Sequence, residues 1–346
     1  MNATSTTGWA PEPQTRGTIG LIWGCLATIF LCTWNAVHPS VPAVKDGPWR
    51  VFWRRVGYML IALATPEFAS GQAIYERWAA RVVQAKSPRW SLTQCFFLTM
   101  GGFVVRSGGE TVSLSPEALL QLLDERVLPW PSRSIEPEIL DRSKADWVLK
   151  SLALLQATWF VTQVIGRAAQ GLPTTTLELF ALGIIFCALF TYVAWWSKPL
   201  DVRGPIFLEL EGPLAIRKET YKRVSLLSPT SVGDESRMPV ALTVGITIVF
   251  GALHLVGWQF HFPTNLEKWL WRASSIACVI LPLLVLVVIR RGFYENGCGN
   301  LITWAIVVMY ALCRVYMMVE MFVGLRAVPV DVYRTPQWSQ YFPSFS

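Results

Sequence analysis

The sequence predicts an all-α membrane protein, a polytopic transmembrane helix bundle of about seven spans with a small helical insert on the cytosolic side. Three observations support this prediction. Apolar residues (AVILMFWYC) make up 53% of the 346 residues and charged residues only 15%, and the mean hydropathy of +0.40 exceeds that of ordinary soluble domains. The chain holds 17 Trp, a residue that collects at membrane headgroups. Its apolar residues also gather in long runs.

The long apolar runs define the predicted spans, because crossing roughly 30 Å of hydrocarbon takes about 20 residues at about 1.5 Å each. Residues 56–74 are also predicted to span, although Pro66 and Glu67 interrupt the run. Residues 90–105 are apolar but short, so they predict an interfacial or re-entrant segment, with an eighth span as the alternative. The six other runs are residues 17–37, 147–168, 176–196, 239–260, 269–289 and 301–325.

Residues 74–86 place Ile74, Trp78 and Val82 on one helical face, which predicts a membrane-surface helix. No internal repeat is visible in the sequence, which argues against a duplicated transporter. The predicted spans divide the chain into five parts. The parts are a polar N-terminal tail (1–16), two spans with the surface helix and the short apolar segment (17–105), a cytosolic helical insert (106–146), a five-span bundle with a cytosolic loop at 197–238 (147–325), and a C-terminal tail (326–346).

The uneven distribution of Lys and Arg predicts the orientation. Seven crossings place 19 of these residues on the side of the N-terminus and eight on the other side, so the positive-inside rule predicts a cytosolic N-terminus and a lumenal C-terminus. The glycosylation sequon at Asn2 would then stay unmodified. The expected location is the endoplasmic reticulum or another endomembrane. The net charge of +7 flanks apolar runs, a pattern that argues against nucleic-acid binding.

Ionisable residues inside the spans are the first candidates for function, since such groups pair with one another, line a wet cavity or perform chemistry. Glu67 adjoins the predicted kink, and Arg314 and Glu320 lie in the last span. Arg314 and Glu320 are six residues apart and cannot face each other on one helix, so each needs another partner. Arg167 and Glu178 lie near span ends, where interhelical ion pairing is the alternative to a functional cavity.

The three histidines, His38, His254 and His261, all fall toward the predicted lumenal side. A three-histidine zinc site is conceivable, but no HxxxH motif or acidic partner supports it, so we expect no metal. Hydrogen-bonded histidines at helix interfaces and acid–base catalysis by His38 and His254 are the remaining interpretations. The sequence also has no diphosphate-binding acidic cluster, di-iron histidine set, P-loop or GxSxG elbow, so we expect chemistry without a cofactor.

Several segments of the chain resemble segments of a known group of proteins. They are residues 33–39 (TWNAVHP), 64–67 (ATPE), 195–202 (WWSKPLDV), 262–263 with 271–272, and 333–343. As a set they resemble a large family of fungal multi-pass membrane proteins, and the resemblance covers nearly the whole chain. Most members have no assigned function. The resemblance implies a place in natural-product pathways, with an association to cycloaddition of terpenoid skeletons.

Together these observations predict a metal-free intramembrane cyclase or isomerase, with Diels–Alder-type cycloaddition as one form, acting on a lipophilic terpenoid-like intermediate of fungal secondary metabolism. Glu67 or Glu320 would donate a proton, assisted by His38 and His254. A non-enzymatic membrane adaptor is the alternative, and a transporter is third. The expected partners are the substrate, the lipid bilayer and pathway enzymes at the same membrane. The predicted substrate-binding residues are Trp34, Asn35, Trp159, Trp258 and Arg314.

Overall fold

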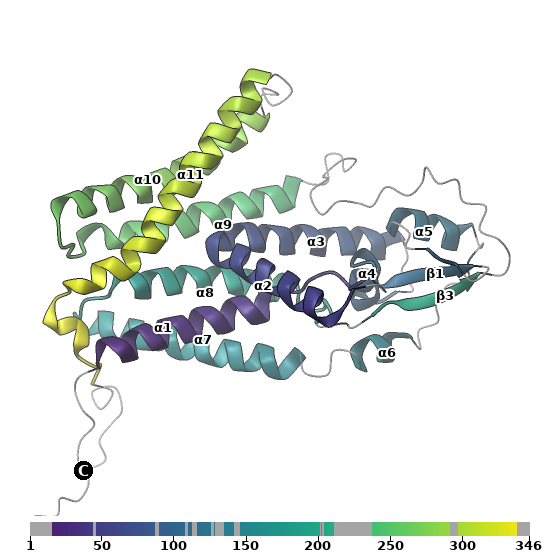
Figure 1. Ribbon diagram of the computed structural model, residues 1–346, viewed down its shortest axis with the longest axis horizontal. Coiled ribbons are helices and arrows are strands. Elements are labelled where there is room, and N and C mark those ends of the chain that lie inside the picture. The colour runs from purple at the N-terminus through teal and green to yellow at the C-terminus, as the bar shows by residue number, and fades with distance from the viewer. Residues whose placement is uncertain are drawn as a thin grey trace, which may run out of the picture.

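The structure, a computed structural model, describes residues 16–43, 46–86, 90–107, 110–112, 116–125, 128, 135–141, 146–200, 202, 204–210, 237–290 and 297–337. These residues form a bundle of long helices with a small sheet at one end (Figure 1). Six described helices are long and apolar enough to cross a membrane, which confirms the predicted polytopic helix bundle. They are α1 (Thr18–Ala36), α7 (Asp146–Ala169), α8 (Thr176–Ala194), α9 (Arg237–Leu255), α10 (Asn265–Arg290) and α11 (Gly297–Val323).

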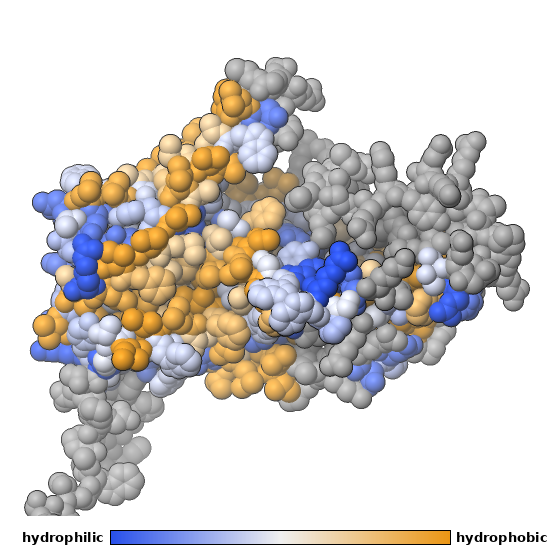
Figure 2. Space-filling model, viewed as in Figure 1, coloured by the Kyte–Doolittle hydropathy of each residue, from blue (hydrophilic) through white to orange (hydrophobic). Residues whose placement is uncertain are grey.

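The surface of the bundle fits a lipid environment. Apolar side chains cover much of the long helices on the face seen in Figure 2, and hydrophilic side chains lie toward both ends. Ile19, Trp23 and Leu155 are among the large apolar residues that point outward. Water would not favour such a surface, whereas hydrocarbon chains would solvate it. The chain is therefore a membrane protein.

The start of α1 lies beside the segment that follows α11. The amide of Arg16 donates to the carbonyl of Tyr333 at 2.6 Å, and the hydroxyls of Thr18 and Tyr333 are 3.0 Å apart. We call this end of the bundle the terminus end and the opposite end, which carries the strands, the sheet end (Figure 1). A chain that enters and leaves at the same end crosses an even number of times. The expectation that the two ends lie on opposite sides of seven spans is therefore wrong.

The predicted span at residues 56–74 is not one helix. It is divided between α2 (Pro48–Ala64) and α3 (Pro66–Lys86), which meet at Thr65 with φ −138° and ψ 68°. Pro66 has no amide hydrogen and disfavours helical geometry at the preceding residue. The two helices form a hairpin that enters from the sheet end and turns inside the bundle (Figure 1). Residues 74–86, predicted as a membrane-surface helix, are the C-terminal part of α3.

A small module closes the sheet end, and its core is continuous with residues of α3 and the end of α8. Its three strands have the order β2-β1-β3, with β1 antiparallel to β2 and parallel to β3. Phe96, Phe97, Phe103, Leu123 and Ile139 are buried in its core. Residues 90–105, predicted as an interfacial or re-entrant segment, form α4 and β1, and the helical insert predicted at 106–146 contains α5 and α6 but also the strand β2. Its elements are α4 (Leu92–Thr99), β1 (Phe103–Ser107), β2 (Glu110–Val112), α5 (Pro116–Asp124), α6 (Ile135–Asp141) and β3 (Ile206–Leu210).

Parts of four predicted segments lie outside the described residues. They are residues 1–15 of the N-terminal tail, 108–109, 113–115, 126–127, 129–134 and 142–145 of the insert at 106–146, 201, 203 and 211–236 of the loop at 197–238, and 338–346 of the C-terminal tail.

Candidate functional site

A pocket opens where α1, α2, α3 and α8 meet, in the half of the bundle nearer the sheet end, and we call it the sheet-end pocket. Its free space, counting the opening to the outside, is about 630 Å³. Most of its wall is apolar. Its polar lining comes from His38, Tyr58, Gln72, Glu76 and Thr191.

His38, one of the predicted catalytic residues, is buried in the wall of this pocket. Its Nδ1 lies 2.9 Å from the carbonyl oxygen of Ala36. Because a carbonyl can only accept, Nδ1 carries the hydrogen and Nε2 is the basic nitrogen. Burial, together with the positive charges of Lys150 and Lys198, holds the pKa of His38 well below its ordinary value of 6.5. The imidazole is therefore neutral at physiological pH.

Glu76 accepts three hydrogen bonds at the mouth of the pocket. Lys198 Nζ lies 2.6 Å from Oε2, the indole of Trp195 donates to the same oxygen at 2.9 Å, and Gln72 donates to Oε1 at 3.1 Å. The ammonium of Lys198 also lies 4.2 Å from the centre of the Trp195 ring. Burial lowers the pKa of Lys198, and Glu76 partly offsets this effect. These contacts fix the position of the Glu76 side chain beside an apolar pocket.

The two segments that carry the family resemblance most clearly meet at this pocket. The rings of His38, from residues 33–39, and Trp195, from residues 195–202, lie 5.3 Å apart. Sequence analysis did not select Glu76. The buried Lys198 next to two tryptophans was the available signal, because a buried ammonium needs a carboxylate partner.

A second polar group, which we call the central cluster, lies at the break between α2 and α3 and consists of Glu67, His254, Tyr310 and Arg314. Tyr310 donates to Oε1 of Glu67 at 2.5 Å. Arg314 donates to the carbonyl of Ala64 through Nε at 3.4 Å and Nη2 at 3.3 Å. Its Nη1 lies 3.5 Å from Nε2 of His254. Three predicted site residues thus come together, and Tyr310 is the member that the sequence did not indicate.

The central cluster is enclosed by apolar groups. The guanidinium of Arg314 lies 4.6 Å from the ring centre of Phe250 and 5.4 Å from that of Phe180. Glu67 is 5% exposed, and its Oε2 has no hydrogen-bond partner among the residues that the structure describes. Pro66 contributes to the wall of the sheet-end pocket, whereas Glu67 does not. The cluster therefore adjoins the pocket without lining it.

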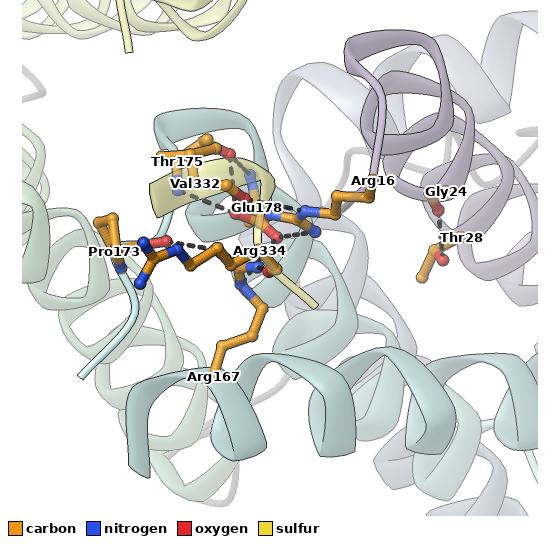
Figure 3. A network of polar contacts seen from close by, with 9 residues as sticks. All are labelled: Arg16, Gly24, Thr28, Arg167, Pro173, Thr175, Glu178, Val332 and Arg334. Carbon is orange, nitrogen blue, oxygen red and sulfur yellow. Dashed lines mark hydrogen bonds and ion pairs between the residues drawn. The ribbon is translucent and has the colours of Figure 1, made fainter. Parts of the chain in front are cut away.

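Figure 3 shows a third polar network, at the terminus end, around Glu178. One carboxylate oxygen lies 2.7 Å from Arg16 and 3.9 Å from Arg167, and the other accepts from the amide and hydroxyl of Thr175 at 2.9 and 3.0 Å. Arg167 also donates to the carbonyls of Pro173 and Arg334. The network pairs Arg167 with Glu178 at the helix ends, as the ion-pairing alternative predicts.

Glu320 lies far along α11 from the central cluster, toward the terminus end. The Tyr316 hydroxyl is 3.5 Å from its Oε2, and Tyr316 also donates to the carbonyl of Glu267 at 3.0 Å. Glu67 and Glu320 therefore do not share one site. Trp258 is at the same end, with the Arg272 guanidinium 4.8 Å from its ring centre.

The other predicted substrate-binding residues have separate surroundings. Trp34 packs beneath the guanidinium of Arg55, 4.5 Å from its ring centre. The Asn35 amide donates to the carbonyl of Leu149 at 3.5 Å and so joins α1 to α7. Trp159 is 55% exposed on the outer face of α7. None of these three is in the pocket wall.

The three histidines lie at different levels of the bundle. His38 is in the sheet-end pocket, His254 is in the central cluster, and His261 lines a cavity at the terminus end. Across the described ranges, no three His, Cys, Asp or Glu residues form a group that could hold a metal ion.

Comparison with known proteins identifies a family. A family model described as a family of unknown function (DUF8562) matches residues 1–217 and 293–345. Neither a curated protein nor a solved structure matches the chain. The match includes His38, Glu76 and three members of the central cluster, while His254 lies between the matched parts. The chain therefore belongs to DUF8562, a family of unknown function.

Proposed function

We propose that the chain is an intramembrane enzyme that cyclises or isomerises a lipophilic, terpenoid-like metabolite without net oxidation or reduction, and that the sheet-end pocket holds the substrate. One observation carries this proposal. The pocket combines apolar walls with a neutral His38 and a carboxylate, Glu76, that three hydrogen bonds hold in place. An apolar pocket with a few convergent polar groups is the usual form of a small-molecule site. The resemblance of residues 33–39 and 195–202 supports a natural-product substrate of fungal secondary metabolism.

The polar lining suits a proton shift. Nε2 of His38 removes a proton from one substrate carbon, and the imidazolium returns it to another position, so the product has the formula of the substrate. The hydroxyl of Tyr58 donates to a substrate carbonyl or epoxide oxygen. In a pericyclic reaction, the same walls would hold the reactive conformer.

Glu67 has a positioning role in this proposal. Its contact with Tyr310 fixes the start of α3, whose Pro66, Gln72 and Glu76 contribute to the pocket. Glu67→Gln should therefore lower the rate through the arrangement of α3, whereas His38→Gln should abolish the proton shift.

Ligand binding and chemistry can be tested separately. The protein is expressed in a host that makes terpenoid precursors, purified in detergent, and its bound lipophilic compounds are identified by mass spectrometry. Ala188→Phe fills the pocket and should remove the bound compound. Leu189→Phe, on the exposed face of the same helix, is the matched control and should retain it. His38→Gln should retain the compound but lose any isomeric product, and an unchanged product would refute the enzymatic proposal.

An adaptor is the second candidate, and the module at the sheet end is the observation that favours it. Among the described residues, β3 is an edge strand of the sheet, and another chain could add to its outer side. In that case Glu209→Pro, on this edge, should abolish the phenotype of the gene while His38→Gln has no effect. The enzyme proposal expects the opposite result.

We also propose an endomembrane location with the sheet end in the cytosol. With six crossings, most Lys and Arg residues belong to the sheet end. Four lie in residues 45–55, nine in 77–144, seven in 198–237 and two in 290–291. The terminus end holds five Lys or Arg residues. The positive-inside rule then favours a lumenal N-terminus, the reverse of the side expected from seven spans, and keeps the C-terminus lumenal. Glycosylation at the native Asn2 sequon tests this orientation, and a cytosolic N-terminus would leave it unmodified.

A further inference from the structure

We propose that α2 is a movable wall of the sheet-end pocket, through which a lipophilic ligand passes sideways between the bilayer and the pocket. This inference rests on the proposed function only in taking the pocket as the ligand site. It concerns the route of entry, which the proposed chemistry does not specify.

The first support is the weak attachment of α2 to the bundle. Tyr58, Ile61 and Ala62 of this helix form one side of the pocket. Only two of its 17 residues, Arg55 and Ala62, are buried, and its main contacts are with α1 and α3. In α8, which forms the opposite wall, most residues are buried. The pocket therefore has one firmly packed wall and one lightly packed wall.

The second support is the surface on the outer side of α2. Phe52, Trp53 and Leu60 are exposed there, and a Cβ added at Gly57 would meet no atom within 4 Å. In a membrane this face contacts lipid. When α2 moves outward, its apolar side chains exchange contacts with the bundle for contacts with lipid hydrocarbon. The movement therefore exposes little apolar surface to water and has a low free-energy cost in a membrane.

The third support is that a few arginine hydrogen bonds, which can break and re-form, attach α2 to its neighbours. At its C-terminal end, Arg314 of α11 donates two hydrogen bonds to the carbonyl of Ala64, a group that a helix end leaves without an intrahelical partner. In the middle of the helix, Arg55 donates to the carbonyl of Trp34 at 3.4 Å, and Arg54 donates to that of Ser40 at 3.2 Å. The break at Thr65 separates α2 from α3, so α2 can move while α3 stays packed.

Native cysteines allow the movement to be measured without a known substrate. Cys32 and Cys187 line the pocket, whereas Cys25 and Cys278 lie elsewhere in the core, and each of the four is 1% exposed. Membranes are treated with N-ethylmaleimide, and the alkylation rate of each cysteine is followed by peptide mass spectrometry. Each cysteine is compared with itself across variants. Cys32 and Cys25 are the decisive pair, because the charge of Arg314 acts directly on Cys187 and Cys278.

Arg314→Gln should raise the alkylation rates of Cys32 and Cys187 by roughly ten- to a hundredfold, the population change expected when hydrogen bonds to a charged donor are lost. Cys25 and Cys278 should keep their rates. Tyr310→Phe is the matched control, because it removes a hydrogen bond from the same helix to Glu67, on the α3 side of the break. It should leave Cys32 and Cys187 unchanged.

Three results would overturn the proposal. They are unchanged rates at Cys32 and Cys187 in Arg314→Gln, an equal increase at all four cysteines, and the same increase in Tyr310→Phe. Arg55→Gln tests the other attachment of α2 and gives a decisive answer if Arg314→Gln does not fold. His38→Gln separates the two proposals, because it should end catalysis and leave every alkylation rate unchanged.

Discussion

Replacing Glu178 with Gln removes the negative charge from the terminus-end network of Figure 3. Glu178 is 1% exposed, and its carboxylate lies 2.7 Å from Arg16 and 3.9 Å from Arg167. Arg167 is equally buried, so it loses its nearest counter-charge without gaining water. Gln keeps the shape of the side chain and an oxygen that can still accept from Thr175. The substitution therefore isolates the contribution of the charge.

The expected loss in the free energy of unfolding is about 3 kcal/mol, at the lower end of the range for breaking a buried ion pair. Two features keep it from being larger. Arg16 is partly exposed and can regain water. Arg167 retains its hydrogen bonds to the carbonyls of Pro173 and Arg334.

The assay is equilibrium unfolding of the purified protein in mixed micelles with increasing denaturing detergent. Asp331→Asn is the matched control, since Asp331 also pairs with an arginine, Arg334 at 3.1 Å, but both side chains are more than half exposed. Its expected effect is below about 0.5 kcal/mol. Equal losses in the two variants would refute the argument that burial decides the strength of these pairs, and so would a loss under about 1 kcal/mol for Glu178→Gln.

Two further predictions concern packing and pH. A Cβ at Gly71 would lie 2.4 Å from Cγ2 of Thr243, where α3 crosses α9, so Gly71→Ala should lower the free energy of unfolding by about 1–3 kcal/mol. Adding Thr243→Ser, which removes Cγ2, should recover part of this loss, whereas Gly57→Ala, with open space around it, should be neutral or stabilising in the same unfolding assay. The pKa of His38 is lowered in the folded protein, so below the ordinary value of 6.5 the unfolded state binds a proton that the folded state does not. The free energy of unfolding should therefore fall as the pH decreases below about 6.5, and His38→Gln should flatten this dependence; an equal slope in both proteins would contradict it.

The membrane-spanning helices could be predicted from the sequence because each is a local, continuous apolar run. Residues 56–74 were wrongly predicted as one span because mean hydropathy reflects the composition of a run and does not show whether the chain reverses direction within it. Pro66 marked a break, but only the contact of Ala64 with Arg314, 250 positions away, indicates that the chain turns back. The sheet was missed for a similar reason, since β1 pairs with β3 about a hundred residues later.

The site was predictable in part. Charges inside apolar runs are rare, so Glu67, His254 and Arg314 were visible as candidates, and tertiary structure brings them together. Glu320 was visible for the same reason but lies elsewhere on α11. Glu76 was not selected because it follows the apolar part of residues 56–74, where a carboxylate is ordinary. Its significance depends on Lys198, which pairs with it from the segment that follows α8.

The pairing of β1 with β3 has a consequence for biogenesis. Between these strands the chain runs through α7 and α8, so the ribosome completes β1 and β2 long before β3 emerges. Until then one edge of β1 has no partner, and an open edge favours association with other chains. If α7 and α8 fail to insert as a pair, β3 is delivered to the wrong side of the membrane and the sheet cannot close. Completion of the sheet thus depends on correct insertion, and an unpaired β1 would mark misassembled chains for quality control.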